Sequence, residues 1–262
     1  ILQWNSAGLG LRVALLTITN GRFITDKDDG MPLAHFDGQH IDFSKIYGSF
    51  RNVHWDRDTI KTNVDLKAEE RSGLIVRSLK AEMKFHPEAM EFEQLDLHTN
   101  NSVIRDYFAM RYDKFSDMSE FISKVRMRAN FADARIDSDD IAFFAPDISD
   151  WNKSINISGL ARGTVQDINA DNLTVEAGNN TWLSGDLTLS GLPDINRTFI
   201  DFRANGMRTT YADAVLFVPR LRQVETPDLT SLRSLEFQGN FTGFLRDFVT
   251  YGTITTNLGT IR

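Results

Sequence analysis

Cysteine is absent from this chain of 262 residues, which excludes disulfides, thiolate zinc sites and a cysteine nucleophile. Long apolar runs are lacking as well, since the longest, such as Val13 to Leu16, are far too short to span a bilayer. Positive charge is scarce: 29 Lys and Arg face 36 Asp and Glu, for a net charge of −7, and no basic run occurs. Nucleic acid is therefore not expected as a partner.

The motifs of the common enzyme classes are missing too. The five histidines have no spacing typical of a metal pair, and the many carboxylates offer no distinguished pair for glycoside hydrolysis. No Gly-x-Ser-x-Gly elbow, P-loop or dinucleotide fingerprint is present. We therefore expect no enzyme activity, no metal site and no cofactor.

The sequence does contain short segments of alternating polarity, clearest from Ile168 to Met207. Leu173, Val175 and Ala177 share one parity, whereas polar residues occupy the other. Side chains of a strand point to opposite faces with a period of two, so each segment predicts a strand with one apolar and one polar face. Gly178 to Asn180 and Gly191 to Asp194 supply the turns between neighbouring antiparallel strands.

The same pattern extends through the chain. The predicted strands of the first part are Arg12–Thr19, Arg22–Thr25, Gln39–Ile46, Asn52–Arg57, Thr59–Ala68, Leu74–His86, Met90–Thr99 and Val103–Tyr112, and Asn20-Gly21 is expected to form a hairpin turn between the first two. Short helices are predicted at Phe115–Ile122, Ile141–Ala145 and Tyr211–Val218. The expected fold class is all-β, with a few short helices that interrupt the sheet.

Three motifs recur in the same order, which indicates an internal repeat. Arg128-Ala129-Asn130 returns as Arg203-Ala204-Asn205, and Phe144-Ala145-Pro146 returns as Phe217-Val218-Pro219. Gly159 to Gly163 is matched by Gly239 to Gly243. We expect residues 1–262 to form one continuous segment of an elongated repeat, with units at 126–200 and 201–262, the second incomplete.

The apolar face of the predicted sheet has two explanations. In a sandwich or a barrel, a second sheet or the opposite wall covers it. Alternatively it stays partly uncovered and forms the floor of a groove, and a long exposed apolar surface of this kind marks a binding site for apolar molecules.

Several segments carry a resemblance to a known family. FIDFRANGMRTTYADAVLFVP, which begins at Phe199, has DLTLSGLPDIN before it and FQGNFTGFLRDFVTYGTITTNLG after it. Together with RDYFAMRYDKFSDMSEFISKVRMRANF, which begins at Arg105, these segments resemble the TamB family of translocation and assembly proteins, in the long form of Bacteroidetes-type bacteria. The similarity extends from about Thr59 to the end of the chain.

The resemblance implies a place and a shape for this chain. TamB-like proteins are grouped with the AsmA-like and bridge-like lipid-transfer proteins, and they cross the periplasm as an elongated, twisted β-sheet folded into a U-shaped groove with an apolar interior. The chain would be a periplasmic middle piece of such a protein, whose inner-membrane anchor lies elsewhere. Adjacent β-segments of the same long chain, and an Omp85-type protein of the outer membrane, would be its partners.

Two functions follow from these expectations. In the first, phospholipid acyl chains slide along the apolar groove, and the residues predicted to contact them are Leu79, Met83, Phe85, Leu173, Val175, Leu183, Leu187, Leu189, Ile200, Phe202, Leu235, Phe237 and Phe241. In the second, exposed sheet edges pair with strands of outer-membrane barrel precursors. A third interpretation, a carbohydrate-binding or adhesive β-solenoid, requires aromatic platforms on the outer face. Trp182 and Phe199 are its candidates, and packing against a loop explains each of them better.

Overall fold

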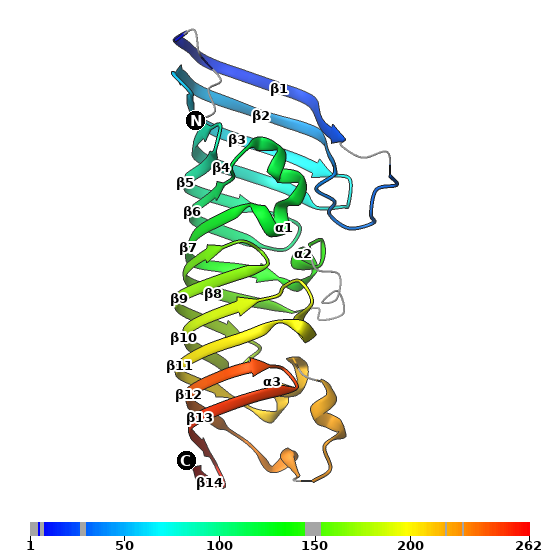
Figure 1. Ribbon diagram of the computed structural model, residues 1–262, viewed down its shortest axis with the longest axis vertical. Helices are drawn as coiled ribbons and strands as arrows, with labels where there is room; N and C mark the ends of the chain where they lie inside the picture. The colour runs from blue at the N-terminus through cyan, green and yellow to red at the C-terminus, as the bar shows by residue number, and fades with distance from the viewer. Residues whose placement is uncertain (1–4, 6–7, 27–29, 145–152, 218, 227) are drawn as a thin grey trace.

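In the part of the chain that it describes, the computed structural model contains one antiparallel sheet of fourteen strands, in which every strand pairs with its neighbours in the sequence. The structure describes residues 5, 8–26, 30–144, 153–217, 219–226 and 228–262. The strands are stacked along the long axis of the molecule, from β1 at one end to β14 at the other (Figure 1). The prediction of an elongated, twisted all-β groove is confirmed.

Most strands are long for a globular protein. Their bounds are β1 (Leu11–Asp26), β2 (His40–Asp56), β3 (Thr59–Glu70), β4 (Ile75–His86), β5 (Ala89–His98), β6 (Val103–Arg111), β7 (Arg126–Asp137), β8 (Ser154–Gly163), β9 (Asp167–Ala177), β10 (Thr181–Ser190), β11 (Phe199–Thr209), β12 (Leu235–Phe244), β13 (Asp247–Thr256) and β14 (Gly259–Ile261). Because the strands are antiparallel, their connections alternate between two rims. The first rim carries the β2–β3, β4–β5 and β6–β7 connections, and the second rim carries β1–β2, β3–β4 and β5–β6.

Short helices lie in the longer connections, close to where the sequence predicts them. They are η1 (Phe115–Glu120) and α1 (Phe121–Lys124) on the first rim, and α2 (Ser138–Ala142), α3 (Tyr211–Phe217), η4 (Pro219–Gln223) and η5 (Leu229–Ser231) on the second. A further turn, η3 (Ile195–Arg197), links β10 to β11 on the first rim. Ala145, Pro146 and Val218, which the repeat motifs include, lie outside the described residues. The division into repeat units stays a prediction.

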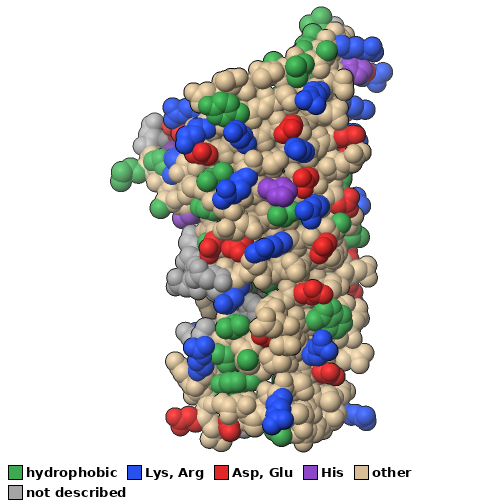
Figure 2. Space-filling view, turned by 180° about the vertical axis from the view of Figure 1, so that it is seen from behind, with side chains coloured by type: hydrophobic (Ala, Val, Ile, Leu, Met, Phe, Trp, Pro, Cys, Tyr) green, Lys and Arg blue, Asp and Glu red, His purple; other side chains and the backbone are tan. Residues whose placement is uncertain are grey.

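The two faces of the sheet differ in polarity, as β3 illustrates. Val64 and Ala68 are buried on the inner face, whereas Lys61, Asp65 and Lys67 are exposed on the outer face. Acidic and basic side chains are interspersed along the outer surface seen in Figure 2. Many of them form cross-strand ion pairs, including Lys45–Glu69, Lys84–Glu93, Arg105–Asp96 and Arg162–Asp171.

The strands bend because nearly all of them contain β-bulges. Register shifts occur in eleven of the thirteen strand pairs, so almost every strand has a local kink. Residues with positive φ lie at these shifts: Asn52, Gln94, Asp106, Asp133 and Asn172. Asn and Asp tolerate the left-handed conformation better than other residues with a side chain. The kinks curl the sheet around its apolar face into a U without closing it.

The bulges also correct two predictions. Asn20-Gly21 is not a hairpin turn, because β1 continues through it, and a register shift against β2 begins there. The predicted break between Ile46 and Asn52 is wrong as well, since β2 runs through this segment with two register shifts against β3. In both places, a residue typical of turns bends a long strand instead of ending it.

Within the described residues, no second sheet lies on the inner face, so the interpretation as a sandwich is wrong.

Among the described residues, no helix is long and apolar enough to cross a membrane.

The bulge at Asn172 gives a first testable prediction. Its φ of 51° is unfavourable for a β-branched residue, so Asn172→Val should lower the free energy of unfolding by about 1–2 kcal/mol. Asn172→Gly, which tolerates this φ, should cost much less. Urea denaturation of both variants measures the difference, and equal losses would contradict the proposed origin of the bend.

Candidate functional site

The inner face of the sheet consists of continuous rows of side chains that run along the molecule, perpendicular to the strands. Residues paired between neighbouring strands lie side by side, so the registers define each row. The row nearest the first rim, called the rim row, contains Ile60, Phe85, Met90, Met110, Met127, Gly163, Ile168, Leu189, Ile200, Gly243 and Phe248. The central row contains Thr62, Met83, Phe92, Phe108, Ala129, Ala161, Ala170, Leu187, Phe202, Phe241 and Thr250.

All of the residues predicted to contact lipid lie on this inner face. Phe85, Leu189 and Ile200 belong to the rim row, and Met83, Leu187, Phe202 and Phe241 belong to the central row. A third row, toward the second rim, contains Val175, Leu183 and Phe237, joined through Met207. Leu79, Leu173 and Leu235 occupy other inner-face positions. The thirteen predicted residues thus share the inner face, and ten of them lie in these three neighbouring rows.

The groove is only partly filled by its own side chains. Of the sixteen buried hydrophobic residues among those described, eight are alanines, whereas most of the large inner-face residues are only half-buried. Of the thirteen predicted residues, Leu173 alone is classed as buried, at 7% exposure. A filled sandwich core would cover its Phe and Leu side chains from both sides. The large side chains here therefore retain apolar surface that faces the groove.

The densest packing lies in the part of the groove formed by β2 to β6. Val64, Ala81, Phe92 and Leu95 form a buried cluster, against which half-buried side chains such as Phe50 pack. Farther along, Ala129, Ala161 and Ala170 follow one another in the central row, between the large residues Phe108 and Leu187. The floor of the groove thus consists of small side chains at its middle.

A strap crosses the mouth of the groove over the densest part. The strap comprises residues 112–125, with η1 and α1, and it lies in front of β3 to β6 in Figure 1. Its ends are fixed at the first rim, where Tyr112 and Val125 are fully buried and the ring of Phe115 lies 6.2 Å from that of Phe85. Burial also raises the pKa of Tyr112 to about 12.

The strap meets the second rim at the β1–β2 loop, of which the structure describes residues 30–39. The ring of Phe121 lies 6.2 Å from that of Phe36, which in turn lies 5.0 Å from Phe144. At Gly38 the two segments come so close that a Cβ atom would lie 2.7 Å from the backbone oxygen of Ser119. Only glycine fits this contact, which links the two rims through the strap.

The Asp37 carboxylate holds the β1–β2 loop in shape. It accepts hydrogen bonds from the backbone N–H groups of Leu33 and Gln39, at 3.1 and 2.9 Å, and its Oδ2 atom lies 2.9 Å from Nδ1 of His40. Burial by itself would raise the pKa of Asp37, but the hydrogen bonds with Leu33, His40 and Gln39 outweigh it and hold the pKa below its usual value.

Beneath the strap lies an apolar cavity of about 300 Å³, here called the strap chamber. Its walls come from the floor, the strap, the β1–β2 region and the segment after α2, and they include Phe23, Phe36, Phe43, Met90, Met110, Phe115, Met118, Phe121 and Phe144. Met90 and Met110 belong to the rim row, so that row continues into the chamber. A pocket of this size lined by aromatic and methionine side chains is suited to a flexible apolar ligand.

Sequence reasoning did not identify the strap chamber. The helical stripe of Phe115, Met118 and Phe121 predicts the short helix, but its position across the groove depends on contacts with Phe36 and Gly38, about eighty residues away. The sequence contains one indication of this position: the apolar side of the predicted helix has no apolar partner nearby in the chain.

Among the described residues, no group of three or more histidine, aspartate or glutamate side chains is arranged to hold a metal ion. The comparisons with known proteins add no family: no protein family, no curated protein and no solved structure matches this chain. Interpretation of the site therefore depends on its geometry.

The contact at Gly38 gives a second prediction. Gly38→Val should displace the strap, because the new side chain collides with Met118 and Ser119, and amide exchange in residues 115–124 should become at least tenfold faster. Gly10→Val is the matched control, since no atom lies within 4 Å of the position of its Cβ. Hydrogen exchange detected by mass spectrometry measures both, and an unchanged strap in the Gly38 variant would contradict the contact.

A third prediction concerns the stability of the β1–β2 loop at low pH. The pKa of Asp37 is lower in the folded protein than in the unfolded chain, so its stabilising effect is present above pH of about 4 and is lost as the pH falls further. Amide exchange of the β1–β2 loop, corrected for intrinsic rates, should therefore rise at low pH before that of β8 to β11. In Asp37→Asn this local pH dependence should be reduced, and an unaltered profile would show that Asp37 is not its origin.

Proposed function

We propose that this protein holds phospholipid acyl chains on its inner face and lets them move along the rows of apolar side chains. The supporting observation is a half-buried apolar surface that is continuous from β3 to β13 and has no second sheet over it within the described residues. Exposed apolar surface of this extent is costly in water, and acyl chains of matching length would cover it.

The energetics favour this occupant. Burial of a methylene group contributes about 0.8 kcal/mol, so a chain of roughly fourteen carbons gains on the order of 10 kcal/mol relative to water. Neighbouring positions in each row, such as Leu187, Phe202 and Phe241, present similar apolar surfaces. Movement from one position to the next therefore requires little change in free energy, while the head group stays in water at the mouth of the groove.

The strap belongs to the same proposal. Because the rim row passes through the strap chamber at Met90 and Met110, a chain that travels the full length of the groove passes beneath residues 115–121. The strap covers such a chain on its open side and increases its buried area. Loosening of the contact between Gly38 and the strap would then widen the passage.

The resemblance to the TamB family supplies the setting of the proposal. In that setting the chain is a periplasmic segment of a bridge anchored in the inner membrane, and the lipids serve the biogenesis of the outer membrane. Its neighbours are adjacent β-segments of the same long chain, with an Omp85-type protein at the outer membrane. No catalytic step is part of this proposal.

A second candidate is a scaffold for outer-membrane barrel precursors, and it is favoured by the open edge of β1. Among the described residues, this strand of 16 residues pairs with β2 alone, and its Leu15, Leu16 and Ile24 side chains are about half exposed. An extended strand of another chain can add to such an edge through backbone hydrogen bonds.

The fourth prediction tests the lipid proposal. The double variant Leu187→Asp and Leu189→Asp places two carboxylates in the central and rim rows, so co-purifying phospholipid should fall at least fivefold. The matched control is Ser184→Asp with Ser190→Asp, which adds the same charge to the outer face of the same strand and should retain lipid. Native mass spectrometry with lipid extraction measures the bound phospholipid.

Circular dichroism shows first whether each variant remains folded. Equal lipid content in the two folded variants would refute lipid binding on the inner face. A bound extended peptide with no phospholipid in the wild-type protein would support the scaffold instead.

A further inference from the structure

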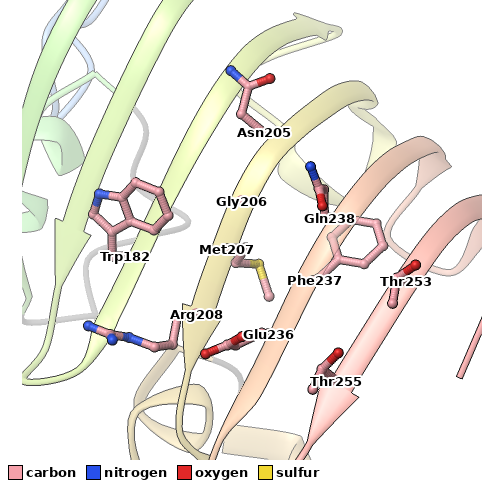
Figure 3. A pocket seen from close by; sticks show the side chains of 10 residues that line it. All are labelled: Trp182, Asn205, Gly206, Met207, Arg208, Glu236, Phe237, Gln238, Thr253 and Thr255. Carbon is pink, nitrogen blue, oxygen red and sulfur yellow. The ribbon is translucent and has the colours of Figure 1, made fainter. Parts of the chain in front are cut away.

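The polar outer face of the sheet, which the proposed function does not involve, carries a tryptophan, Trp182, that borders two depressions. Two depressions of about 430 and 520 Å³ lie on β7 to β13, and Trp182 and Arg208 line both of them. Figure 3 shows the first depression, which is bordered by Asn205, Glu236 and Gln238. The indole thus stands at the meeting point of two hollows that are lined mostly by polar side chains.

A bulge in β11 creates this arrangement. The registers of β11 shift against β10 and β12 at Asn205 and Gly206, so these two residues oppose Gln238 alone. A Cβ atom on Gly206 would lie 3.1 Å from Cζ3 of Trp182, so the absence of a side chain allows the six-membered ring to lie over the strand. Figure 3 shows the indole broadside, with the Arg208 side chain directed toward it.

The polar groups around the indole are available to a ligand. Arg208 and Glu236 are directly opposed on β11 and β12, yet no ion pair joins them. Within the described part of the chain, the side chains of Asn205 and Gln238 also have no hydrogen-bond partner. Elsewhere on the outer face, some charges are paired across strands, as in Lys84–Glu93 and Arg162–Asp171.

We propose that this surface, called the Trp182 site, binds an oligosaccharide whose pyranose ring stacks on the indole. The face of an aromatic ring is electron-rich, and it attracts the weakly positive axial C–H groups of a sugar whose hydroxyl groups are equatorial. The side-chain amides of Asn205 and Gln238, the guanidinium of Arg208 and the carboxylate of Glu236 lie around the indole. They supply hydrogen-bond donors and acceptors for those hydroxyl groups. A few polar groups around an aromatic surface are the usual composition of a specific small-ligand site.

Other ligands fit the Trp182 site less well. The net charge of −7 and the nearby Glu176 and Glu236 disfavour nucleic acid. A quaternary ammonium group requires a cage of several aromatic rings, whereas the first depression adds only Phe237 to Trp182, and Phe237 belongs to the inner face. Acyl chains have the inner face of the sheet, so sugar binding at the outer face is independent of lipid binding.

The experiment uses cellotetraose and chitotetraose as probes, because their β-1,4-linked rings present flat faces. Isothermal titration calorimetry with the wild-type chain should detect binding of at least one probe, together with a change in tryptophan fluorescence. Trp182→Ala should weaken the affinity at least tenfold. Gly206→Val, which pushes the indole off the strand, should also weaken it, while Trp182→Phe should retain part of the affinity.

Tyr251→Ala is the matched control, because Tyr251 is an outer-face aromatic residue of β13 that is 74% exposed and lines neither depression. It should bind the probes as the wild type does. Absence of binding at millimolar concentration of both probes, or equal affinities of wild type and Trp182→Ala, would overturn the proposal. Binding of phospholipid vesicles through Trp182 without sugar binding would overturn it too. Lipid content measured in parallel separates this outcome from failure of the groove proposal.

Discussion

The bend that β-bulges introduce into nearly every strand is the constraint on which the rest of this structure depends. A sheet with one apolar face in water must cover that face, and a barrel or a second layer is the usual solution. Here the strands kink at residues such as Asp133 and Asn172, so the sheet folds around its own apolar face. Since no strand pairing joins the two rims within the described residues, the interior remains a groove.

An interior of this kind is an incomplete core. Small residues such as Ala129 and Ala170 are buried where the sheet curves, while Leu187 and Phe202 keep part of their surface in contact with the groove. Each strand between β1 and β14 pairs with the strands before and after it, so local pairing stabilises the molecule segment by segment, as in repeat proteins. The apolar surface left over is a cost to the free protein and a source of binding free energy for an apolar ligand.

The strap and the Trp182 site show how differently the two faces are built. On the inner side, residues 112–125 close the mouth of the groove through a contact at Gly38 and create a chamber from surfaces that the sheet alone leaves open. On the outer side, the bulge at Asn205 and Gly206 places an indole beside polar groups that have no partner among the described residues. In both places a glycine permits a close approach, to backbone at Gly38 and to the ring of Trp182 at Gly206.

The sequence by itself determined the all-β class, the separation of the faces and the thirteen inner-face positions from Leu79 to Phe241, because alternation with a period of two is a local property of each strand. It could not distinguish a turn from a bulge at Asn20 or Asn52, since both require the same left-handed backbone conformation. Only the tertiary structure decided that the sheet stays open, that Phe121 reaches Phe36 and that Trp182 lies over Gly206. These features depend on contacts between residues distant in the sequence, which no local pattern records.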